Sequence, residues 1–230
     1  MKSIAIIPAR GGSKRIPRKN IRPFLGRPII AYSIEAALQS GLFGEVMVST
    51  DDEEIAQVAR EHGASVPFLR SREASDDLAT TAQVLEEVLA KYKEAGEEFD
   101  VACCLYPTAP FVTGELLQAG YAKLKEGDFD TVFPVLRYSY PIWRSLKVEQ
   151  GRAAMNWPEH LNSRSQDLPA AFHDAGQFYW FKVDRFLEGK RLLTDNSGVM
   201  ELAELEAQDI DSETDWRLAE LKYKLLHNIA

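Results

Sequence analysis

The sequence has few cysteines and no long hydrophobic run. Its two cysteines, Cys103 and Cys104, are adjacent in an apolar stretch, where successive side chains of a strand point to opposite faces, so we expect reduced core residues and no disulfide. No apolar segment approaches the roughly 20 residues of a membrane-spanning helix. The apolar run in MKSIAIIPAR is also too short for a signal-peptide core. We therefore expect a cytoplasmic protein with no membrane partner.

Acidic residues are missing from one stretch of the chain. Residues 10–27 include seven Lys or Arg and no Asp or Glu, although the chain has 35 acidic against 27 basic residues and a formal net charge of −8. This overall acidity argues against a nucleic-acid partner. One cationic stretch on an acidic body suits a small polyanion, and a solvated basic loop is the alternative.

The length and composition predict one folded domain. The chain has 230 residues, of which 45% are hydrophobic and 27% charged, as in ordinary globular proteins. This length suits one α/β domain with a sizeable core. No linker or internal repeat divides residues 1–230, so we treat them as one unit.

Short apolar stretches rich in β-branched residues alternate with segments of helical spacing over the first 136 residues. This alternation predicts an α/β fold with a doubly wound, mostly parallel sheet that has helices on both faces. Ligands of such sheets lie beyond the carboxyl ends of the strands, and the basic loop follows the first strand. The expected strands are 3–8, 44–50, 65–69, 100–106 and 131–136, and the expected helices are 28–40, 51–62, 81–95 and 113–126.

The alternation stops at about residues 138–175. Pro141, Pro158 and Pro169 occur there among aromatic residues with few helix signals, which indicates an arm inserted into the domain. The pattern then resumes with expected strands at 176–182 and 197–205 and a last helix at 211–227.

The loop after the first strand has the composition of a polyphosphate site. Residues 7–21 read IPARGGSKRIPRKNI. Glycines allow a backbone to approach a ligand closely and turn its amides toward it, and Arg and Lys add charge-assisted hydrogen bonds. The glycine spacing fits neither a P-loop nor a dinucleotide fingerprint.

Five stretches in order carry a family resemblance. Residues 9–14 (ARGGSK), continuing to PRKN at 17–20, resemble the first motif of the cytidylyltransferases that activate sialic acid and related acidic sugars. Within that family, YPTAPF at 106–111 and FHDAGQFYW at 172–180 are most similar to the pseudaminic acid enzymes. The other matching stretches are STD at 49–51, DLATT at 77–81, YPTAP at 106–110 and DID at 209–211.

The resemblance implies a CTP site. Arg10, Ser13 and Lys14 would surround the phosphates, and Lys19 and Asn20 would close the nucleotide side. Lys19, with Arg10, would offset the charge that develops at the α-phosphate, whereas we leave Arg15 and Arg18 as solvated charges.

Two further nucleotide contacts follow from the same resemblance. Arg70 and Thr81 match positions that the family uses for the cytosine and ribose. Thr81 or Asp77 could instead cap a helix.

Asp209 and Asp211 are the expected metal ligands. In an extended segment, residues two apart lie on one face, and Mg²⁺ prefers one or two carboxylates together with phosphate oxygens and water. The alternative is that Asp211 only caps the last helix. We favour Mg²⁺ because the family has the same pair before the same helix.

The resemblance also implies a sugar site, with departures from the sialic acid enzymes. His173 stands where those enzymes have Arg, Tyr106 replaces a glutamine, and Arg164 is one place from the usual arginine of the arm. These changes favour a different acidic sugar and a more aromatic pocket. The expected sugar contacts are Tyr106, Arg164, Phe172, His173, Gln177 and Tyr179.

The expected reaction is transfer of CMP from CTP to the anomeric hydroxyl of a nonulosonic acid, with release of pyrophosphate. Pseudaminic acid is the favoured sugar; the alternatives are N-acetylneuraminic acid, legionaminic acid or an eight-carbon ulosonic acid. A non-catalytic nucleotide-binding module is the alternative of a different class. The arm resembles a segment that reaches a second subunit, so we expect a homodimer.

Overall fold

The computed structural model describes residues 1–71, 73–74 and 79–229. Seven strands form one mixed sheet in the order β11-β6-β10-β5-β1-β4, and β9 pairs with β6 outside that path. The strands are β1 (Ser3–Pro8), β4 (Glu45–Ser49), β5 (Val101–Leu105), β6 (Thr131–Arg137), β9 (Phe172–Asp174), β10 (Phe178–Lys182) and β11 (Ser197–Leu202).

The sheet is mostly parallel, as predicted. β1 runs parallel to β4 and β5, and β11 runs parallel to β6, whereas β10 is antiparallel to both of its neighbours, β5 and β6. Because β10 is reversed, its first residues lie at the edge where β1 and β5 have their carboxyl ends. The segment before β10 can therefore reach the ligand edge of the sheet.

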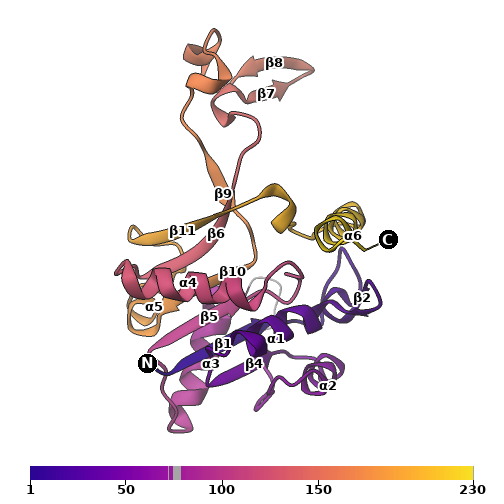
Figure 1. Cartoon of the computed structure of the whole chain (residues 1–230), viewed down its shortest axis with the longest axis vertical. Helices are drawn as coiled ribbons and strands as arrows, with labels where there is room; N and C mark the ends of the chain where they lie inside the picture. The colour runs from indigo at the N-terminus through magenta and orange to yellow at the C-terminus, as the bar shows by residue number, and fades with distance from the viewer. Residues whose placement is uncertain (72, 75–78, 230) are drawn as a thin grey trace.

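Helices cover both faces of the sheet (Figure 1). Buried side chains of α1, α2 and α4 pack on one face, against residues such as Ile7 and Trp180. Those of α3 and α5 pack on the other face, against residues such as Ile6 and Phe181. The helices are α1 (Ile29–Ser40), α2 (Glu53–Glu61), α3 (Thr81–Glu94), α4 (Gly114–Glu126), α5 (Val183–Gly189) and α6 (Glu213–His227).

Helix α6 packs at the ligand edge. Trp216 and Ala219 of α6 form a separate buried cluster with Ile16 of the basic loop, Phe24 and Ile210. Phe24 belongs to a short hairpin made by β2 (Pro23–Phe24) and β3 (Arg27–Pro28). The end of the chain is thus fixed beside the loop that follows β1.

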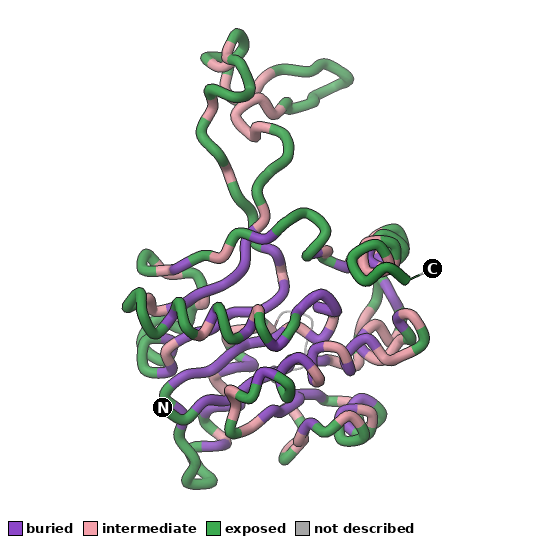
Figure 2. The backbone as a smooth tube through the Cα atoms, in the orientation of Figure 1, coloured by how far each residue is buried: buried purple, intermediate pink, exposed green. Residues whose placement is uncertain are grey.

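The predicted arm projects from the body between β6 and β9 (Figure 1). It contains a hairpin of β7 (Leu146–Glu149) and β8 (Arg152–Met155), with the 3₁₀ turns η2 (Ile142–Arg144), η3 (Pro158–His160) and η4 (Ser165–Asp167). Figure 2 shows that the arm is largely exposed, whereas the strands of the body are buried. Cys103 and Cys104 are free and buried, as expected.

The predicted strand at residues 65–69 is wrong. Only Ser65 forms an isolated parallel bridge, to Met47 of β4. Pro67 has no N–H to donate to a neighbouring strand, and the next backbone hydrogen bond to this edge comes at Arg70, whose amide donates to the Thr50 carbonyl at 2.8 Å. Helix α5 lies in a segment where no helix was expected.

Candidate active site

The basic loop is held in a defined form between β1 and the 3₁₀ turn η1 (Lys19–Ile21). The Asn20 side chain donates to the Arg10 carbonyl at 2.9 Å, and the Ser13 amide donates to the Gly11 carbonyl at 3.0 Å. Arg18 takes a left-handed conformation, with φ of 56°, where the chain turns into η1. Asn20 is buried and braces the loop, and its contact with the nucleotide stays a prediction.

A cavity of about 480 Å³ opens over this loop. Four cationic side chains line it, from Arg10, Lys14, Arg15 and Lys19. Such a concentration of positive charge with loop amides suits a polyphosphate. The other lining residues are Pro8, Ser13, Ile16, Asn20, Pro107 and Thr108.

A second cavity of about 260 Å³ shares Pro8 and Arg10 with the first. Arg70, Thr81 and Tyr106 line it, with Ala74, Ala79 and Val84. The two cavities therefore meet at the carboxyl end of β1. The first would hold phosphates, and the second has the smaller, less charged lining expected around a nucleoside.

Arg70 is fixed from the side of β4. Its guanidinium donates to the Ser49 hydroxyl at 3.1 Å and to the Ser49 carbonyl at 2.5 Å. Burial lowers the pKa of Arg70, but a guanidinium stays protonated at neutral pH. Arg70 thus presents a fixed cation to the second cavity.

Thr81 is the first residue of α3 and not its cap. The cap is Thr80, whose hydroxyl accepts from the Gln83 amide in a capping box. The capping alternative for Thr81 is therefore wrong, and its side chain lines the cavity. Asp77 lies outside the described residues.

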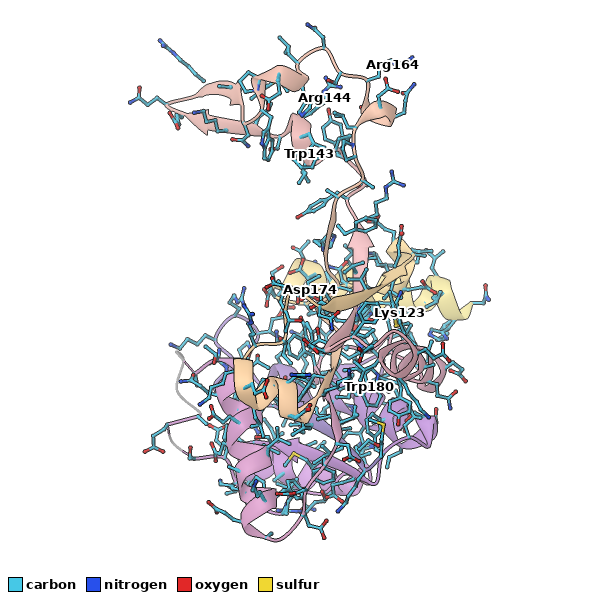
Figure 3. All side chains as sticks on the ribbon, turned by 90° about the vertical axis from the view of Figure 1, so that its left-hand side faces the viewer. Lys123, Trp143, Arg144, Arg164, Asp174 and Trp180 are labelled. Atoms are coloured by element: carbon cyan, nitrogen blue, oxygen red, sulfur yellow. The ribbon has the colours of Figure 1, made fainter. Side chains whose placement is uncertain are left out.

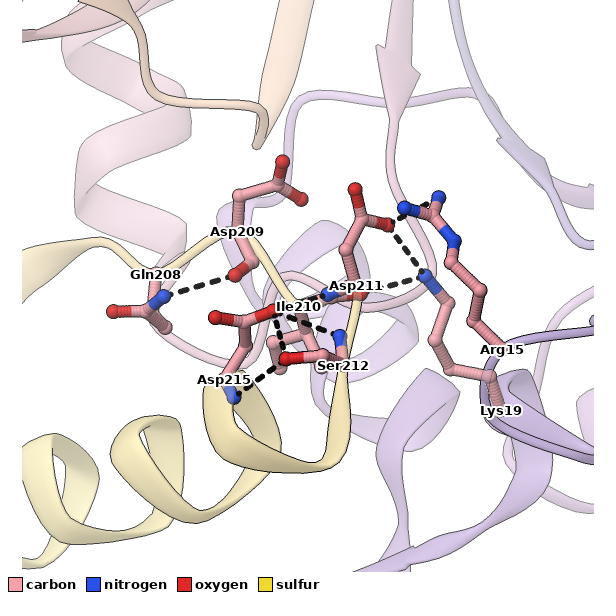
Figure 4. Close-up of polar contacts among 8 residues, drawn as sticks. All are labelled: Arg15, Lys19, Gln208, Asp209, Ile210, Asp211, Ser212 and Asp215. Atoms are coloured by element: carbon pink, nitrogen blue, oxygen red, sulfur yellow. Dashed lines mark hydrogen bonds and ion pairs between the residues drawn. The ribbon is translucent and has the colours of Figure 1, made fainter. Parts of the chain in front are cut away.

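The segment of Asp209 and Asp211 lies beside the basic loop (Figure 4). Ile210 is fully buried between them, and the two carboxylates point to the same side of the segment, as the alternation predicts. The Lys19 ammonium donates to the Ile210 carbonyl at 2.7 Å and lies 3.6 Å from an Asp211 carboxylate oxygen. Arg15 also binds Asp211, at 2.8 Å.

Asp211 does not cap α6. Ser212 is the N-cap, and its hydroxyl accepts from the Asp215 amide while the Asp215 carboxylate accepts from Ser212. The capping alternative for Asp211 is therefore wrong. Its carboxylate instead faces the cations of the loop.

The aspartate pair suits a divalent cation. Asp209 is exposed, yet desolvation and the negative charge of Asp211 raise its pKa, with a partial offset from Lys19. A bound cation would relieve that repulsion. Within the described part of the chain, no three His, Cys, Asp or Glu side chains gather as a metal site, so phosphate oxygens and water would complete the shell.

Two packed tyrosines, Tyr106 at the second cavity and Tyr179 on β10, form what we call the tyrosine wall. The rings of Tyr106 and Tyr179 lie 5.6 Å apart, edge to face. The pKa of Tyr106 is raised, mainly by burial, with a partial offset from hydrogen bonding with Thr81 and Tyr179. The Tyr179 hydroxyl donates to the Asp174 carboxylate, so the hydroxyl groups link α3 to the start of β10.

Asp174 is a site residue that the sequence did not single out. Its carboxylate also accepts from the Gly176 amide at 2.8 Å. Gly176 has φ of 65°, and a side chain there would lie 3.8 Å from the Asp209 carboxyl carbon. Gln177, an expected sugar contact, is buried and donates to the Glu206 carbonyl at 2.7 Å. Asp174 therefore holds the Tyr179 hydroxyl and the turn at Gly176, which lies next to Asp209.

Three expected sugar contacts lie away from the two cavities of their own chain. Arg164 sits on the arm and pairs with Asp167 at 2.7 Å (Figure 3). Phe172 and His173 are exposed on β9, where the His173 ring packs 4.9 Å from Tyr138. Their role in sugar binding stays a prediction.

The fold and the site define a nucleotide-binding α/β protein whose cationic loop lies next to a pair of carboxylates. A family profile described as cytidylyltransferase matches residues 4–186. The chain belongs to the cytidylyltransferase family and is a nucleotidyltransferase, which confirms the resemblance seen in the sequence.

Relatives cover the whole chain. It is 42% identical to a pseudaminic acid cytidylyltransferase of Campylobacter jejuni subsp. jejuni serotype O:2, over 100% of both chains. It is 33% identical to a CMP-N,N'-diacetyllegionaminic acid synthase of Legionella pneumophila subsp. pneumophila, over 96% of this chain and 95% of that protein.

A solved structure shares the fold. CMP:2-keto-3-deoxy-manno-octonic acid synthetase complexed with CTP superimposes with a TM-score of 0.71 at 19% identity, covering 99% of this chain and 100% of that one. The likeness confirms the predicted fold class. Among the described residues, no helix is long and apolar enough to cross a bilayer.

Proposed function

We propose that this protein transfers CMP from CTP to the anomeric hydroxyl of pseudaminic acid, a nonulosonic acid, and releases pyrophosphate. One observation carries the proposal: the two cavities meet at Arg10, and the loop lysine that lines the larger one, Lys19, contacts the Asp209–Asp211 segment. The 42% identity to a pseudaminic acid cytidylyltransferase over the full chain supports the choice of sugar.

The loop residues would act by position and charge. Ser13, Lys14 and Arg10 bind the triphosphate over the loop, while Arg70 and Thr81 hold the nucleoside in the second cavity. The sugar hydroxyl attacks the α-phosphorus and gives its proton to solvent, and the bond from that phosphorus to the oxygen shared with the β-phosphorus breaks, so that pyrophosphate leaves. Lys19 offsets the charge that develops on the α-phosphate, which needs no covalent intermediate.

Asp209 and Asp211 would hold Mg²⁺. The cation, when bound, neutralises phosphate charge and favours ionisation of the attacking hydroxyl. The raised pKa of Asp209 and the shared direction of the two carboxylates support this assignment. Without the cation, Lys19 and Arg15 compensate part of the negative charge of Asp211.

The sugar would lie between the tyrosine wall and the aspartate pair. Tyr106, directly after β5, and Tyr179 of β10 would border this region, and Gln177, directly before β10, is buried behind them. The same reaction on N-acetylneuraminic, legionaminic or an eight-carbon ulosonic acid is the alternative, which the 33% identity to a legionaminic acid synthase keeps in view.

The test is pyrophosphate release from CTP and Mg²⁺, with pseudaminic, N-acetylneuraminic, legionaminic and an eight-carbon ulosonic acid in parallel. Release with pseudaminic acid alone supports both the reaction and the sugar. Release with N-acetylneuraminic acid alone supports the alternative sugar. Binding of CTP without release for any of the acids supports the non-catalytic nucleotide-binding module.

We also propose a homodimer in which the arm reaches the second subunit. The arm exposes apolar side chains that its own body leaves uncovered, at Tyr140, Leu146, Val148 and Leu161. Arg164, Phe172 and His173 would then face the partner's sugar. A monomer in light scattering at micromolar concentration would contradict the dimer. The cytoplasm is the proposed location because CTP, the proposed donor, is found there.

A further inference from the structure

We infer that Asp52 is a positioning residue that holds the phosphate-binding loop (residues 9–18) in its binding form by clamping Arg18. The inference concerns the loop at which the proposed function places the triphosphate, and it rests on that function. Neither residue was expected to act there, since Arg18 was taken as a solvated charge and Asp52 as part of the α2 region.

The clamp is a two-pronged ion pair. The Arg18 guanidinium donates to both carboxylate oxygens of Asp52, at 2.5 and 3.1 Å, and also to the Glu54 carboxylate. Such parallel contacts fix the orientation of both groups more strongly than a single contact does. Arg18 is also the residue with a positive φ at the exit of the loop, so the clamp acts at the strained position.

The entry of the loop is seated on the same acidic turn. The Gly11 amide donates to the Asp51 carboxylate at 2.9 Å. A side chain at position 11 would meet the Asp52 carboxylate oxygen at 2.7 Å and its β-carbon at 2.9 Å. Only glycine allows this approach, so the turn at Asp51 and Asp52 holds the loop near both of its ends.

The clamp also solves a charge problem. Asp51, Asp52 and Glu54 stand beside a site for a polyanion and would repel it if they were unpaired. Arg18 neutralises part of this charge, and the strong hydrogen bond from Arg18 lowers the pKa of Asp52. Arg18 does not line the phosphate cavity, whereas Arg10, Lys14, Arg15 and Lys19 do. The Arg18 charge therefore neutralises the acidic turn, whereas the charges of the four cavity residues face the ligand.

A clamp of this kind sets the fraction of molecules that can bind. If the loop occupies its binding form only a tenth of the time, the apparent affinity falls about tenfold, while bound molecules react as before. Loss of the clamp should therefore raise the KM for CTP by about tenfold, and kcat should change by less than about twofold.

The test uses Asp52→Asn in the full-length protein. Asp52 also caps α2 by accepting from the Ile55 amide at 3.0 Å, and asparagine caps a helix as well as aspartate does. The change therefore removes the charged clamp and keeps the cap. Arg18→Lys is the companion variant because it keeps the charge and loses the two-pronged geometry.

Glu53→Gln is the matched control. Glu53 lies on the same turn of α2 and pairs with Arg60 at 2.8 Å, away from the loop. We expect the KM for CTP to rise about tenfold in Asp52→Asn and Arg18→Lys and to stay unchanged in Glu53→Gln. If the KM for CTP in Asp52→Asn and Arg18→Lys is the same as in Glu53→Gln, the clamp is overturned. Additive effects in the double variant Arg18→Lys/Asp52→Asn would overturn it too, because two halves of one contact cannot act independently.

Amide hydrogen exchange of the ligand-free protein measures the opening of the loop independently of turnover. The Gly11 and Ser13 amides should exchange faster in Asp52→Asn than in the wild type and in Glu53→Gln. Unchanged exchange would overturn the inference. If the amides exchange faster in Asp52→Asn but the wild type shows no turnover with CTP, the clamp is retained and the proposed function is rejected.

Discussion

The Lys19 ammonium lies 3.6 Å from a carboxylate oxygen of Asp211, although the two residues lie near opposite ends of the sequence. The contact depends on Ile210, which is buried against Ile16 and Trp216 and whose carbonyl accepts from Lys19. The last helix therefore fixes the acidic segment, and the first loop supplies its counterion. Folding of the whole domain is required to assemble the site.

Lys19→Ala should lower kcat by roughly 100-fold, the usual loss when one stabilising donor is removed from a transition state. CTP binding should be largely kept, because Arg10, Lys14 and Arg15 remain in the cavity. Steady-state kinetics and calorimetric titration with CTP measure the two effects. Lys123→Ala is the control, since Lys123 also donates to a backbone carbonyl, that of Val199 at 2.6 Å, but lies on α4. An unchanged kcat would remove Lys19 from the chemistry.

Asp209→Asn should raise the melting temperature at neutral pH without divalent cations. The pKa of Asp209 is raised in the folded protein, so the wild type loses stability as the pH rises through that pKa. The variant has no such loss. The difference should vanish below the ordinary pKa of aspartate, because Asp209 is then protonated both folded and unfolded.

Mg²⁺ gives the second half of that experiment. It should raise the melting temperature of the wild type with CTP, by mass action on the folded state, and should have little effect on Asp209→Asn. The same response to Mg²⁺ in both proteins would contradict the metal assignment. Turnover should be lost in the variant.

Asp174→Asn should raise the KM for the sugar by about tenfold, since a neutral acceptor holds the Tyr179 hydroxyl with roughly half the strength. The KM for CTP should not change. Tyr179→Phe keeps the ring and removes the hydroxyl, and the double variant should behave as Tyr179→Phe alone. Independent effects of the two changes would show that Asp174 acts on the sugar without Tyr179.

Phe43 and Trp180 should stabilise the body jointly. Their rings stack with centroids 5.0 Å apart and planes 9° apart, and the Trp180 indole donates to the Leu117 carbonyl. A double-mutant cycle with Phe43→Leu and Trp180→Leu should give a coupling energy of about 0.5–1.5 kcal/mol. Urea denaturation at one protein concentration measures it, and strictly additive losses would mean that the stack adds nothing beyond burial.

Much of the fold could be predicted because each strand and helix of the first 136 residues has a local signature. The stretch 65–69 misled because Val66 and Phe68 suggest a strand, while Pro67 forbids the continuous pairing that a strand needs. The reversal of β10 was out of reach, since its buried residues read the same in either direction. Direction depends on where the arm returns the chain to the sheet.

The candidate site also contains residues that the sequence predicted and residues that it did not. The cluster of Arg10, Ser13, Lys14 and Lys19 was readable because glycines and cations gather in one short segment. Asp52 and Asp174 could not be predicted. The partner of Asp52, Arg18, is distant in sequence, and the contact of Asp174 with the Tyr179 hydroxyl depends on the fold. Asp52 also resembles an ordinary helix cap, which it is.

The reversed strand β10 brings residues of the second half of the chain to the ligand edge of the sheet. In the proposed function, the loop after β1, Arg70 and the start of α3 would meet the nucleotide, whereas residues 172–179 would meet the sugar from the opposite chain direction. Exchange of this stretch between relatives would then alter several of the proposed sugar contacts at once and leave the loop after β1 unchanged.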